Sequence, residues 1–184
     1  MRIVIIVTLA VVSMATTSLA HCQQRCPQFW HLFQGYCYRY FGDRVSWSSA
    51  EAECNKYFTD RGCMARLISI HSEEENNFAY ELFRSSAGDT PDWRINRRNP
   101  SAVYGFWTGA HQQVSDGPWV HTDGTAFDYL NWMSGEPNDN YYDLHDEDCV
   151  MVWRRYDMDD DLRQMNDEYC DDNVSFICKM KANH

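Results

Sequence analysis

Residues 134–149 read SGEPNDNYYDLHDEDC, and residues 165–170 read MNDEYC. Oxygen-bearing side chains are concentrated in both stretches, and each stretch ends at a cysteine. Calcium is a hard cation that takes about six to eight oxygen ligands from carboxylates, amide carbonyls and water. The side chains with suitable oxygens are Glu136, Asn138, Glu147, Asn166 and Asp167. The two stretches therefore predict one calcium site to which both contribute.

The mixture of acids and amides suits a second task. A sugar hydroxyl that is bound to calcium also donates to a carboxylate and accepts from an amide N–H, and an all-carboxylate cage would supply no donor. A bridge between Cys149 and Cys170 would hold the two stretches side by side and lower the entropy cost of assembling the site. A cis peptide at Pro137 would turn Glu136 and Asn138 toward one ion.

Acid-rich loops also have a simpler explanation, which is solvation of an acidic protein. The formal net charge is -11 at pH 7, and it argues against nucleic acid and anionic membranes as partners. The acidic stretches lack the ligand spacing, central glycine and terminal glutamate of an EF-hand. Residues 157–161 (DMDDD) are a further acidic cluster, which we interpret as a solvated loop.

The N-terminus has the features of a secretory signal peptide. Arg2 gives a positive start, residues 3–12 are apolar, and small residues lead up to Ala20. We expect residues 1–20 to be removed, which leaves a secreted single domain at residues 21–184. The apolar run is short for a membrane span, and no later segment is a candidate, so membrane insertion is not expected.

Eight cysteines lie after residue 20. An even number in a secreted chain predicts disulfides. Eight cysteines allow about 105 pairings, so this count leaves the connectivity open.

The hydrophobic pattern predicts an α+β domain, with two helices early and strands late. One helix is expected to start near Ser46 or Ser48, with Gly62 beyond its end, and another at Ser72. Ser48 with Glu51, and Ser72 with Glu75, have capping-box spacing. Strands are expected near residues 36–40, 66–70, 106–107, 119–121, 125–127, 149–153 and 176–180. Asp123-Gly124 predicts a hairpin turn, and residues 85–104, 134–147 and 156–164 are expected to be irregular.

Taken in order, these residues resemble the C-type lectin-like domain family over nearly all of residues 21–184. The resemblance is carried by Cys26-Pro27, Phe29-Trp30, Cys37-Tyr38, Trp47, Ala50, Cys54, residues 67–72 (LISIHS), residues 106–109 (FWTG), Asn131-Trp132, residues 135–138 (GEPN), residues 147–149 (EDC), Asn166-Asp167, Cys170 and residues 176–178 (FIC). It implies two helices, two small antiparallel sheets and a long calcium-binding loop region.

The resemblance also implies specific pairings and ligands. The implied disulfides are Cys26–Cys37, Cys54–Cys178 and Cys149–Cys170. The implied calcium and sugar ligands are Glu136, Asn138, Glu147, Asn166 and Asp167. The Glu-Pro-Asn triplet resembles the version that prefers mannose, N-acetylglucosamine or fucose, whereas the galactose-preferring version has Gln and Asp around the proline.

A second calcium site is also suggested by the resemblance. Asp116, Asp139 and Asp148 stand where its ligands often fall, although Gln112 replaces an expected carboxylate. The loop between the Glu-Pro-Asn triplet and Glu147 is longer than in compact family members. It adds three side chains that either contact sugar or cover the loop: Tyr141, Tyr142 and His145.

Cys22 and Cys63 are left over by the implied pairings. They either bridge each other or link subunits into a disulfide-bonded homo-oligomer, and the N-terminal position of Cys22 favours the interchain bond. Asn173-Val174-Ser175 is a glycosylation sequon.

The function expected from these features is secreted, calcium-dependent binding of glycans or glycoproteins, and the family suggests innate recognition of microbes. The alternative is a protein of the same fold that binds a mineral surface, ice or a protein partner. An enzyme is not expected, because the histidines stand in neither a Gly-x-Ser-x-Gly nor a His-Glu-x-x-His motif. Glu136 and Glu147 resemble a glycosidase pair, but their neighbouring asparagines fit an ion better.

Overall fold

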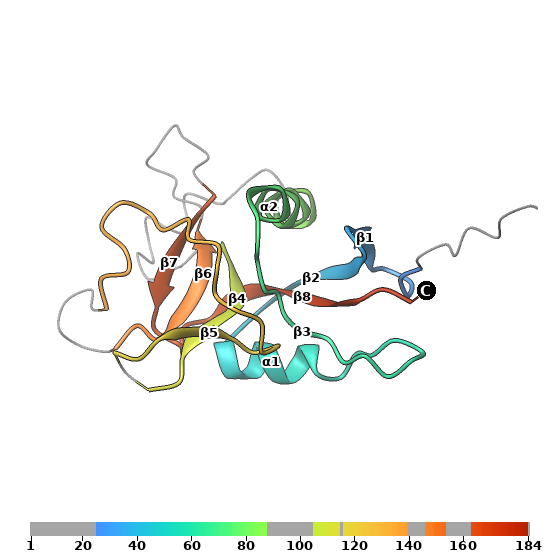
Figure 1. Ribbon diagram of the computed structural model, residues 1–184, viewed down its shortest axis with the longest axis horizontal. Helices are drawn as coiled ribbons and strands as arrows, with labels where there is room; N and C mark the ends of the chain where they lie inside the picture. The colour runs from blue at the N-terminus through green and yellow to red at the C-terminus, as the bar shows by residue number, and fades with distance from the viewer. Residues whose placement is uncertain (1–24, 88–104, 115, 140–145, 154–162, 184) are drawn as a thin grey trace, which may run out of the picture.

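The computed structural model describes residues 25–87, 105–114, 116–139, 146–153 and 163–183. The expected signal peptide and Cys22 lie outside these ranges. Within them the chain forms two helices and eight strands (Figure 1). In chain order these are β1 (His31–Phe33), β2 (Tyr36–Val45), α1 (Trp47–Cys54), β3 (Arg66–Leu67), α2 (Glu73–Ala87), β4 (Gly105–Gln112), β5 (Trp119–His121), β6 (Cys149–Trp153), β7 (Gln164–Glu168) and β8 (Val174–Lys181).

The strands form one connected sheet in the order β1-β2-β8-β4-β6-β7, with β3 beside β8 and β5 beside β4. Neighbouring strands in the described residues pair antiparallel, except that β4 runs parallel to β8. The α+β prediction is therefore confirmed. The two small sheets that the resemblance implied are two antiparallel halves, which the β4–β8 pair joins into one mixed sheet.

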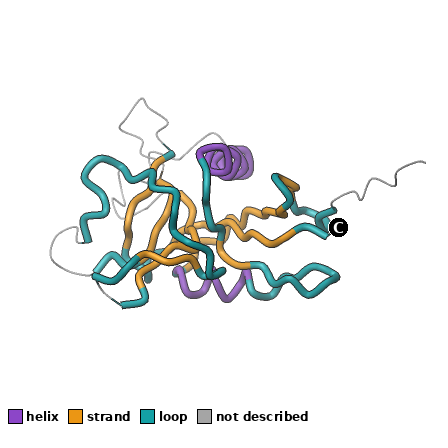
Figure 2. The backbone as a smooth tube through the Cα atoms, in the orientation of Figure 1, coloured by secondary structure: helices purple, strands orange, loops and turns teal. Residues whose placement is uncertain are grey.

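The two helices cover opposite sides of the β2–β8 pair (Figure 2). Successive side chains of a strand point to opposite faces, and β8 uses both. Phe176 and Cys178 pack in the cluster that contains Ala50 of α1. Ile177 packs in the cluster that contains Tyr80 of α2. The uninterrupted apolar run at residues 176–178 is thus explained by burial on both faces.

Helix α1 begins at the first of its two predicted start points, two residues before the predicted Ser48–Glu51 capping box. Ser46 is the N-cap and makes no side-chain capping bond, and Ser48 lies inside the helix. The Glu51 carboxylate is engaged elsewhere, because it accepts hydrogen bonds from Leu67 N at 2.8 Å and from Arg66 Nη1 at 3.0 Å. The Ser48–Glu51 capping box is therefore wrong, and Glu51 instead ties α1 to β3.

Helix α2 begins as predicted. The Ser72 hydroxyl accepts a hydrogen bond from Glu75 N at 3.1 Å. The Glu75 carboxylate accepts a hydrogen bond from His71 N at 2.9 Å. In a capping box this donor would be the backbone N of Ser72, so the observed bond is shifted by one residue. Glu73, Glu74 and Glu75 lie in the first turn, where carboxylates favour the positive end of the helix dipole.

Two of the expected strands differ in the structure. The strand expected at residues 66–70 is reduced to β3 at Arg66–Leu67. The hairpin expected around Asp123-Gly124 is wrong, because residues 125–127 form no strand. Asp123 Oδ1 accepts hydrogen bonds from both the backbone N and the hydroxyl of Thr125, at 2.9 and 2.6 Å. This local side-chain turn competes with strand pairing.

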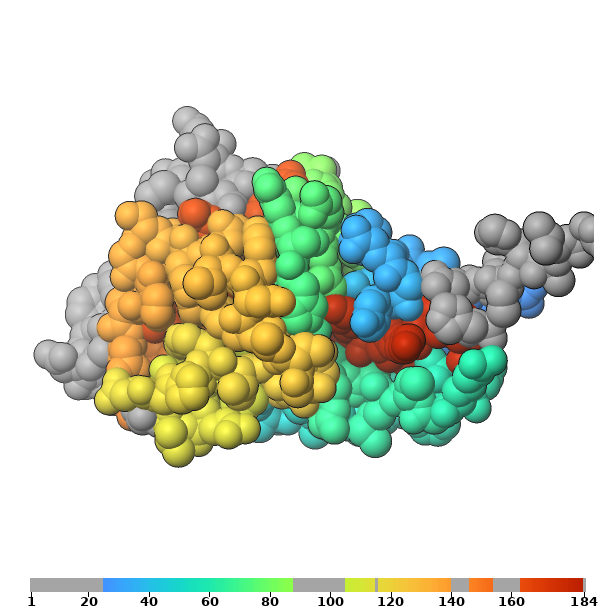
Figure 3. Space-filling model, in the orientation of Figure 1, coloured from blue at the N-terminus to red at the C-terminus, as the bar shows by residue number. Residues whose placement is uncertain are grey.

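The three implied disulfides are confirmed. Cys26–Cys37 fixes the N-terminal strands, Cys54–Cys178 ties α1 to β8, and Cys149–Cys170 joins β6 to the segment after β7. In the space-filling view, residues 105–139 gather at one end of the molecule (Figure 3). The N-terminal strands and residues 55–65 lie at the other end. Among the described helices, none has the length and apolar character to cross a membrane.

Candidate functional site

Strand β7 carries two of the five predicted calcium ligands. Its pairing with β6 sets Asn166 opposite Met151 and Asp167 opposite Val150. The two residues are 6% and 0% exposed. The sequence did not predict β7. Pairing with β6 holds the backbone of Asn166 and Asp167 in place, which the acidic residue pattern alone does not indicate.

The loop that carries the Glu-Pro-Asn triplet is bonded to β7. Met133 N donates to Met165 O at 2.9 Å, and the Glu136–Pro137 peptide is cis. The Asp167 carboxylate then accepts two backbone hydrogen bonds, from Asn138 N at 3.2 Å and from Asp139 N at 2.7 Å. Asp167 therefore closes the triplet loop directly against the strand that carries Asn166.

Glu147 lies two residues before β6, whose first residue, Cys149, pairs with Glu168 of β7. Glu147 is 8% exposed, and its carboxylate lies within electrostatic range of Glu168. Burial, followed by the charges of Glu147, Asp172 and Asp167, raises the pKa of Glu168 to about 8. Acidic groups that raise one another's proton affinity also favour a bound cation.

The three residues predicted for a second calcium site are close together in the structure. Burial raises the pKa of Asp139, and Asp116, Asp146 and Asp148 raise it further. Burial also raises the pKa of Asp148, with contributions from Asp146 and Asp116. The shifts show that these carboxylates repel one another.

Three buried oxygens in this cluster have no hydrogen-bond partner: Asp139 Oδ1, Asp148 Oδ1 and Gln112 Oε1. Gln112 is held in place, because its Nε2 donates to Gly117 O at 2.7 Å and its backbone N donates to Asp148 O at 2.8 Å. A buried polar atom without a partner costs about 1–3 kcal/mol. Two carboxylate oxygens and one amide oxygen are ligands that calcium accepts, so the residues present fit this ion.

No three His, Cys, Asp or Glu side chains within the described ranges form a metal cage by themselves. Each predicted calcium site therefore needs amide oxygens beside its carboxylates, from Asn138 and Asn166 at β7 and from Gln112 beside Asp139. Tyr141, Tyr142 and His145 lie outside the described residues. Asn173 is exposed, and its carbonyl accepts a hydrogen bond from Arg44 Nε at 2.9 Å, so the glycosylation of Asn173 stays a prediction.

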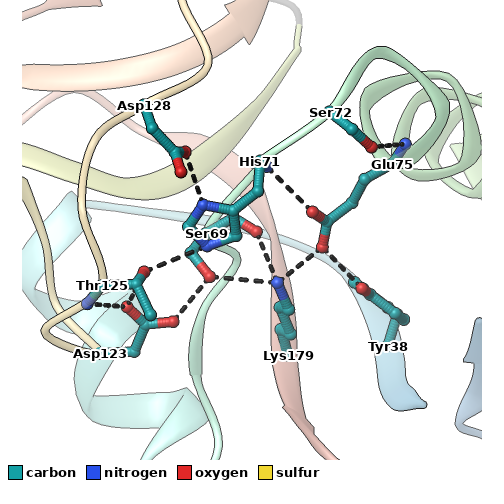
Figure 4. A network of polar contacts seen from close by, with 9 residues as sticks. All are labelled: Tyr38, Ser69, His71, Ser72, Glu75, Asp123, Thr125, Asp128 and Lys179. Carbon is teal, nitrogen blue, oxygen red and sulfur yellow. Dashed lines mark hydrogen bonds and ion pairs between the residues drawn. The ribbon is translucent and has the colours of Figure 1, made fainter. Parts of the chain in front are cut away.

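A second network of buried polar groups was missed by the sequence analysis (Figure 4). Lys179 Nζ lies 2.6 Å from Glu75 Oε1 and donates to Ser69 O at 2.9 Å. The Tyr38 hydroxyl donates to the same Glu75 oxygen at 2.6 Å, and burial together with Glu75 raises the pKa of Tyr38. These residues are far apart in the sequence, so no local pattern indicates the network.

Two histidines lie beside this network. His71 Nδ1 is 2.7 Å from Asp128 Oδ1, and its Nε2 is 3.1 Å from the Thr125 hydroxyl (Figure 4). His121 is 4% exposed, and neither of its ring nitrogens has a hydrogen-bond partner. Burial lowers the pKa of His121 to about 4, although the nearby Asp123 opposes the shift. His121 is therefore neutral at physiological pH.

Comparisons with known proteins agree with this architecture. A family model described as "Lectin C-type domain" matches residues 43–180. The chain is 33% identical over 175 residues to the alpha-N-acetylgalactosamine-specific lectin of Patiria pectinifera, over 93% of this chain and 92% of that protein.

Two solved structures with a similar fold are described as different kinds of protein. The C-type carbohydrate-recognition domain of cow CD23, crystallised with a GlcNAc2Man3 oligosaccharide, has a TM-score of 0.63 and 27% identity, and the match covers 88% of this chain and 100% of that one. A calcium-independent type II antifreeze protein also has a TM-score of 0.63, with 25% identity and coverage of 89% and 99%.

Proposed function

Because this chain belongs to the C-type lectin domain family, we propose that it is a secreted lectin that binds glycans in a calcium-dependent manner. Related proteins are named as lectins or were crystallised with an oligosaccharide. The signal-like residues 1–20 support secretion. Glycans on microbial surfaces are ligands that a free secreted lectin of this kind would meet.

The observation that carries the proposal is the closure of the triplet loop by Asp167. Its two hydrogen bonds to Asn138 N and Asp139 N hold the loop on β7, beside Asn166. Glu136 and Asn138 stand on either side of Pro137, and the Glu136–Pro137 peptide is cis. The loop and the strand thus present acid and amide groups from two parts of the chain to one region.

In the proposed site the calcium ligands are Glu136, Asn138, Glu147, Asn166 and Asp167. A bound calcium ion would coordinate neighbouring hydroxyls of the sugar. The carboxylates then accept hydrogen bonds from those hydroxyls, and the asparagine amides donate to them. This division of roles orients a pair of hydroxyls, which is the basis for choosing one sugar over another.

For the sugar class, the Glu136-Pro137-Asn138 triplet supports mannose-, N-acetylglucosamine- or fucose-type ligands. The Patiria pectinifera relative is named for a different sugar, alpha-N-acetylgalactosamine. We assign the mannose-type class to this chain, because the order of acid and amide around Pro137 decides which hydroxyl donates and which accepts.

A second, structural calcium ion is proposed at Asp116, Asp139, Asp148 and Gln112. The unpartnered oxygens described above support it. Asp139 belongs to the triplet loop and Asp148 directly follows Glu147, so this ion would stiffen both loops of the sugar site. Asp146 lies close enough to add negative charge.

A glycan array in calcium, repeated in EDTA, tests the proposal. We expect mannose-type ligands to bind in calcium and to be released by EDTA. Glu147→Gln should abolish binding, whereas the control Glu53→Gln, a partly buried residue of α1 that pairs with Lys56, should bind normally. Mannose-type binding that persists in EDTA would contradict the mechanism.

The sugar class has its own test. Glu136→Gln combined with Asn138→Asp should move the array preference toward galactose-type ligands, because the donor and acceptor roles across the two hydroxyls are exchanged. An unchanged preference would show that the rest of the loop selects the sugar.

Ice binding is a second candidate, favoured by the likeness to the calcium-independent type II antifreeze protein. Thermal hysteresis measured with and without EDTA separates the two functions. A lectin without ice affinity depresses freezing only as a simple solute does. Growth arrest of ice crystals, together with an empty glycan array, would favour the second candidate.

A further inference from the structure

Arg39 of β2 is a cation surrounded by aromatic rings. Its guanidinium carbon lies 4.7 Å from the ring centroid of Phe41, 5.3 Å from that of Tyr57 and 5.8 Å from that of Phe29. The rings come from β2, from the segment after α1 and from the turn before β1. We call these four residues the Arg39 surface.

The hydrogen-bond donors of Arg39 are available to a ligand. Stacking on rings uses the faces of the guanidinium and leaves its N–H groups, which lie in its plane, for other partners. Within the described residues Arg39 forms no side-chain hydrogen bond or salt bridge, and its nitrogens are not among the buried atoms that lack a partner. The donor edge of Arg39 therefore faces solvent.

The acid that touches this surface, Glu53, is already engaged. Its Oε2 accepts from Lys56 Nζ at 2.5 Å, and its Oε1 accepts from the Tyr57 hydroxyl at 3.4 Å. Hydrogen bonds between a guanidinium and an anion are stronger than those between neutral groups. An anionic group from outside the chain can therefore take the donor edge of Arg39.

Phe29 stands in a backbone conformation that disfavours it. Trp30 N donates to Pro27 O at 3.1 Å, and the φ of Phe29 is 69°. The third position of a turn takes a positive φ only in types that favour glycine or asparagine there. Phe29 is also 70% exposed, so burial of its ring does not offset the strain. A strained residue that exposes a large apolar ring beside Arg39 indicates a role in binding.

The charge of the molecule is divided between its two ends. The N-terminal strands and residues 105–139 lie at opposite ends (Figure 3). Residues 25–66 contain six Arg and Lys and four Asp and Glu, whereas the described part of residues 105–173 contains one Arg and twelve Asp and Glu. An anionic ligand is therefore attracted to the end that carries the Arg39 surface and repelled from the other end.

We propose that the Arg39 surface is a second glycan site, which binds an acidic saccharide without calcium. The anionic group of the saccharide, a carboxylate or a sulfate, accepts hydrogen bonds from the edge of Arg39. The C–H face of a sugar ring packs on the exposed ring of Phe29, which removes apolar surface from water. This site goes beyond the calcium-dependent function, because it differs in location, in charge and in ligand.

A saccharide matches these groups better than an acidic polypeptide does. Arg39 offers one planar donor edge, and Phe29 offers one exposed ring. An acidic polysaccharide carries an anionic group and an apolar ring face in each repeat. The carboxylates of a polypeptide stand on flexible side chains, whose ordering costs conformational entropy, and they bring no ring for Phe29.

Binding of the full secreted chain to immobilised polymers in EDTA tests the proposal, because EDTA silences a calcium site. Polygalacturonate carries carboxylates and dextran sulfate carries sulfates, so the two probes distinguish the anionic groups. Dextran lacks the anion, and polyglutamate lacks the sugar ring. We expect at least one acidic polysaccharide to bind and to be released by salt, and we expect both controls to fail.

Two outcomes of this experiment would overturn the proposal. If neither acidic polysaccharide bound, the site would be absent, while mannose-type binding in calcium would be unaffected. If polyglutamate bound as tightly as the acidic polysaccharides, the partner would be an acidic polypeptide instead of a saccharide.

Variants of Arg39 test its part in binding. Arg39→Met keeps the apolar stem and should weaken binding by about tenfold or more. Arg39→Lys keeps the charge but not the planar edge, so its loss should be intermediate. Lys56→Met is the matched control, because the Lys56 charge is exposed and already paired with Glu53, and it should change binding by less than about twofold. An equal loss in Lys56→Met and Arg39→Met would mean non-specific attraction and would overturn the proposal.

Phe29→Gly separates binding from folding. Glycine accepts a φ of 69°, so the thermal midpoint should stay unchanged or rise, whereas acidic-saccharide binding should weaken by about fivefold. The control Leu130→Ala removes an apolar side chain from a residue that is 65% exposed at the other end of the molecule, and it should bind normally. A lower thermal midpoint in Phe29→Gly with unchanged binding would make Phe29 a structural residue and would overturn its assigned role.

Discussion

The molecule balances buried charge differently at Glu75 and at Asp139. At Glu75 the chain supplies its own cation, because Lys179 Nζ lies 2.6 Å away and both side chains are 6% exposed. At Asp139 the neighbouring charged groups are acids, and two carboxylate oxygens lack partners. The first cluster is complete as folded, whereas for the second we propose a cation from outside.

The difference has a clear energetic meaning. Removing one partner of a buried ion pair leaves an uncompensated charge, which is strongly unfavourable. Repelling carboxylates instead raise each other's pKa, and a bound cation removes that penalty. One cluster should therefore control folding stability at all calcium concentrations, and the other should make stability depend on calcium.

The largest effect is expected from Lys179→Met. We predict a loss of about 3–5 kcal/mol in the free energy of unfolding, because the buried Glu75 carboxylate loses its partner cation. Urea denaturation in saturating calcium measures the loss. The double variant Lys179→Met/Glu75→Gln should recover part of it, and a single-variant loss well below about 1 kcal/mol would show that the pair is not a major source of stability.

Acid should lower the stability of the folded protein by protonating His121. Its pKa in the folded protein is about 4, below the ordinary value of 6.5, so the unfolded chain binds the extra proton first. Stability is full above about pH 6.5 and falls as the pH drops toward 4. The loss should be on the order of 3 kcal/mol.

The variant His121→Phe isolates this effect from other acidic transitions. It keeps an aromatic ring beside Phe127, whose centroid lies 5.4 Å from that of His121, and it cannot be protonated. Urea unfolding between pH 7 and pH 4 in EDTA should show a flatter pH dependence than the wild type. If the stability of the variant and of the wild type changed equally with pH, the acid sensitivity would come from groups other than His121.

Calcium should stabilise the fold through the acidic cluster. At a free concentration about 100-fold above Kd, one bound ion adds about 2.7 kcal/mol to the free energy of unfolding. Asp148→Asn should reduce this gain, whereas Lys179→Met should keep it, since the two clusters are separate. Thermal unfolding in a calcium titration checks this, and an unchanged midpoint would count against the second site.

The smallest effect is expected from Lys56→Met, the exposed counterpart of Lys179→Met. Lys56 pairs with Glu53, but the Lys56 side chain is 67% exposed. Solvent-exposed ion pairs contribute little to stability. We predict no change in urea unfolding beyond experimental error, and a clear destabilisation would mean that ion pairing in this protein does not depend on burial.

The residues of the proposed calcium sites are indicated by local sequence motifs, whereas those of the Glu75 cluster are not. Glu136, Asn138 and Asp148 stand in short motifs whose residue types already indicate an ion. Lys179 stands inside the apolar run FICKM and pairs with a residue 104 positions earlier. Only the tertiary fold brings such groups together, so their chemistry is not visible in a local window.

The secondary structure also was predictable where it depends on neighbouring residues and was missed where it depends on distant ones. Helix α2 was predicted because Ser72 and the glutamates after it act within one turn. Strand β7 was missed because its polar residues Gln164, Asn166 and Asp167 become a strand only through pairing with β6. The hairpin at Asp123 failed because a side-chain bond to Thr125 replaced the expected ladder.

The position of β8 has a consequence for how the protein is made. This strand pairs with β2, β3 and β4 at once, yet the ribosome synthesises it after all three. The sheet therefore cannot close while β8 is still inside the ribosome, and the earlier strands wait with open edges. Until β8 pairs with them, such open edges favour aggregation, so we expect chaperones that shield them to increase the yield of folded protein.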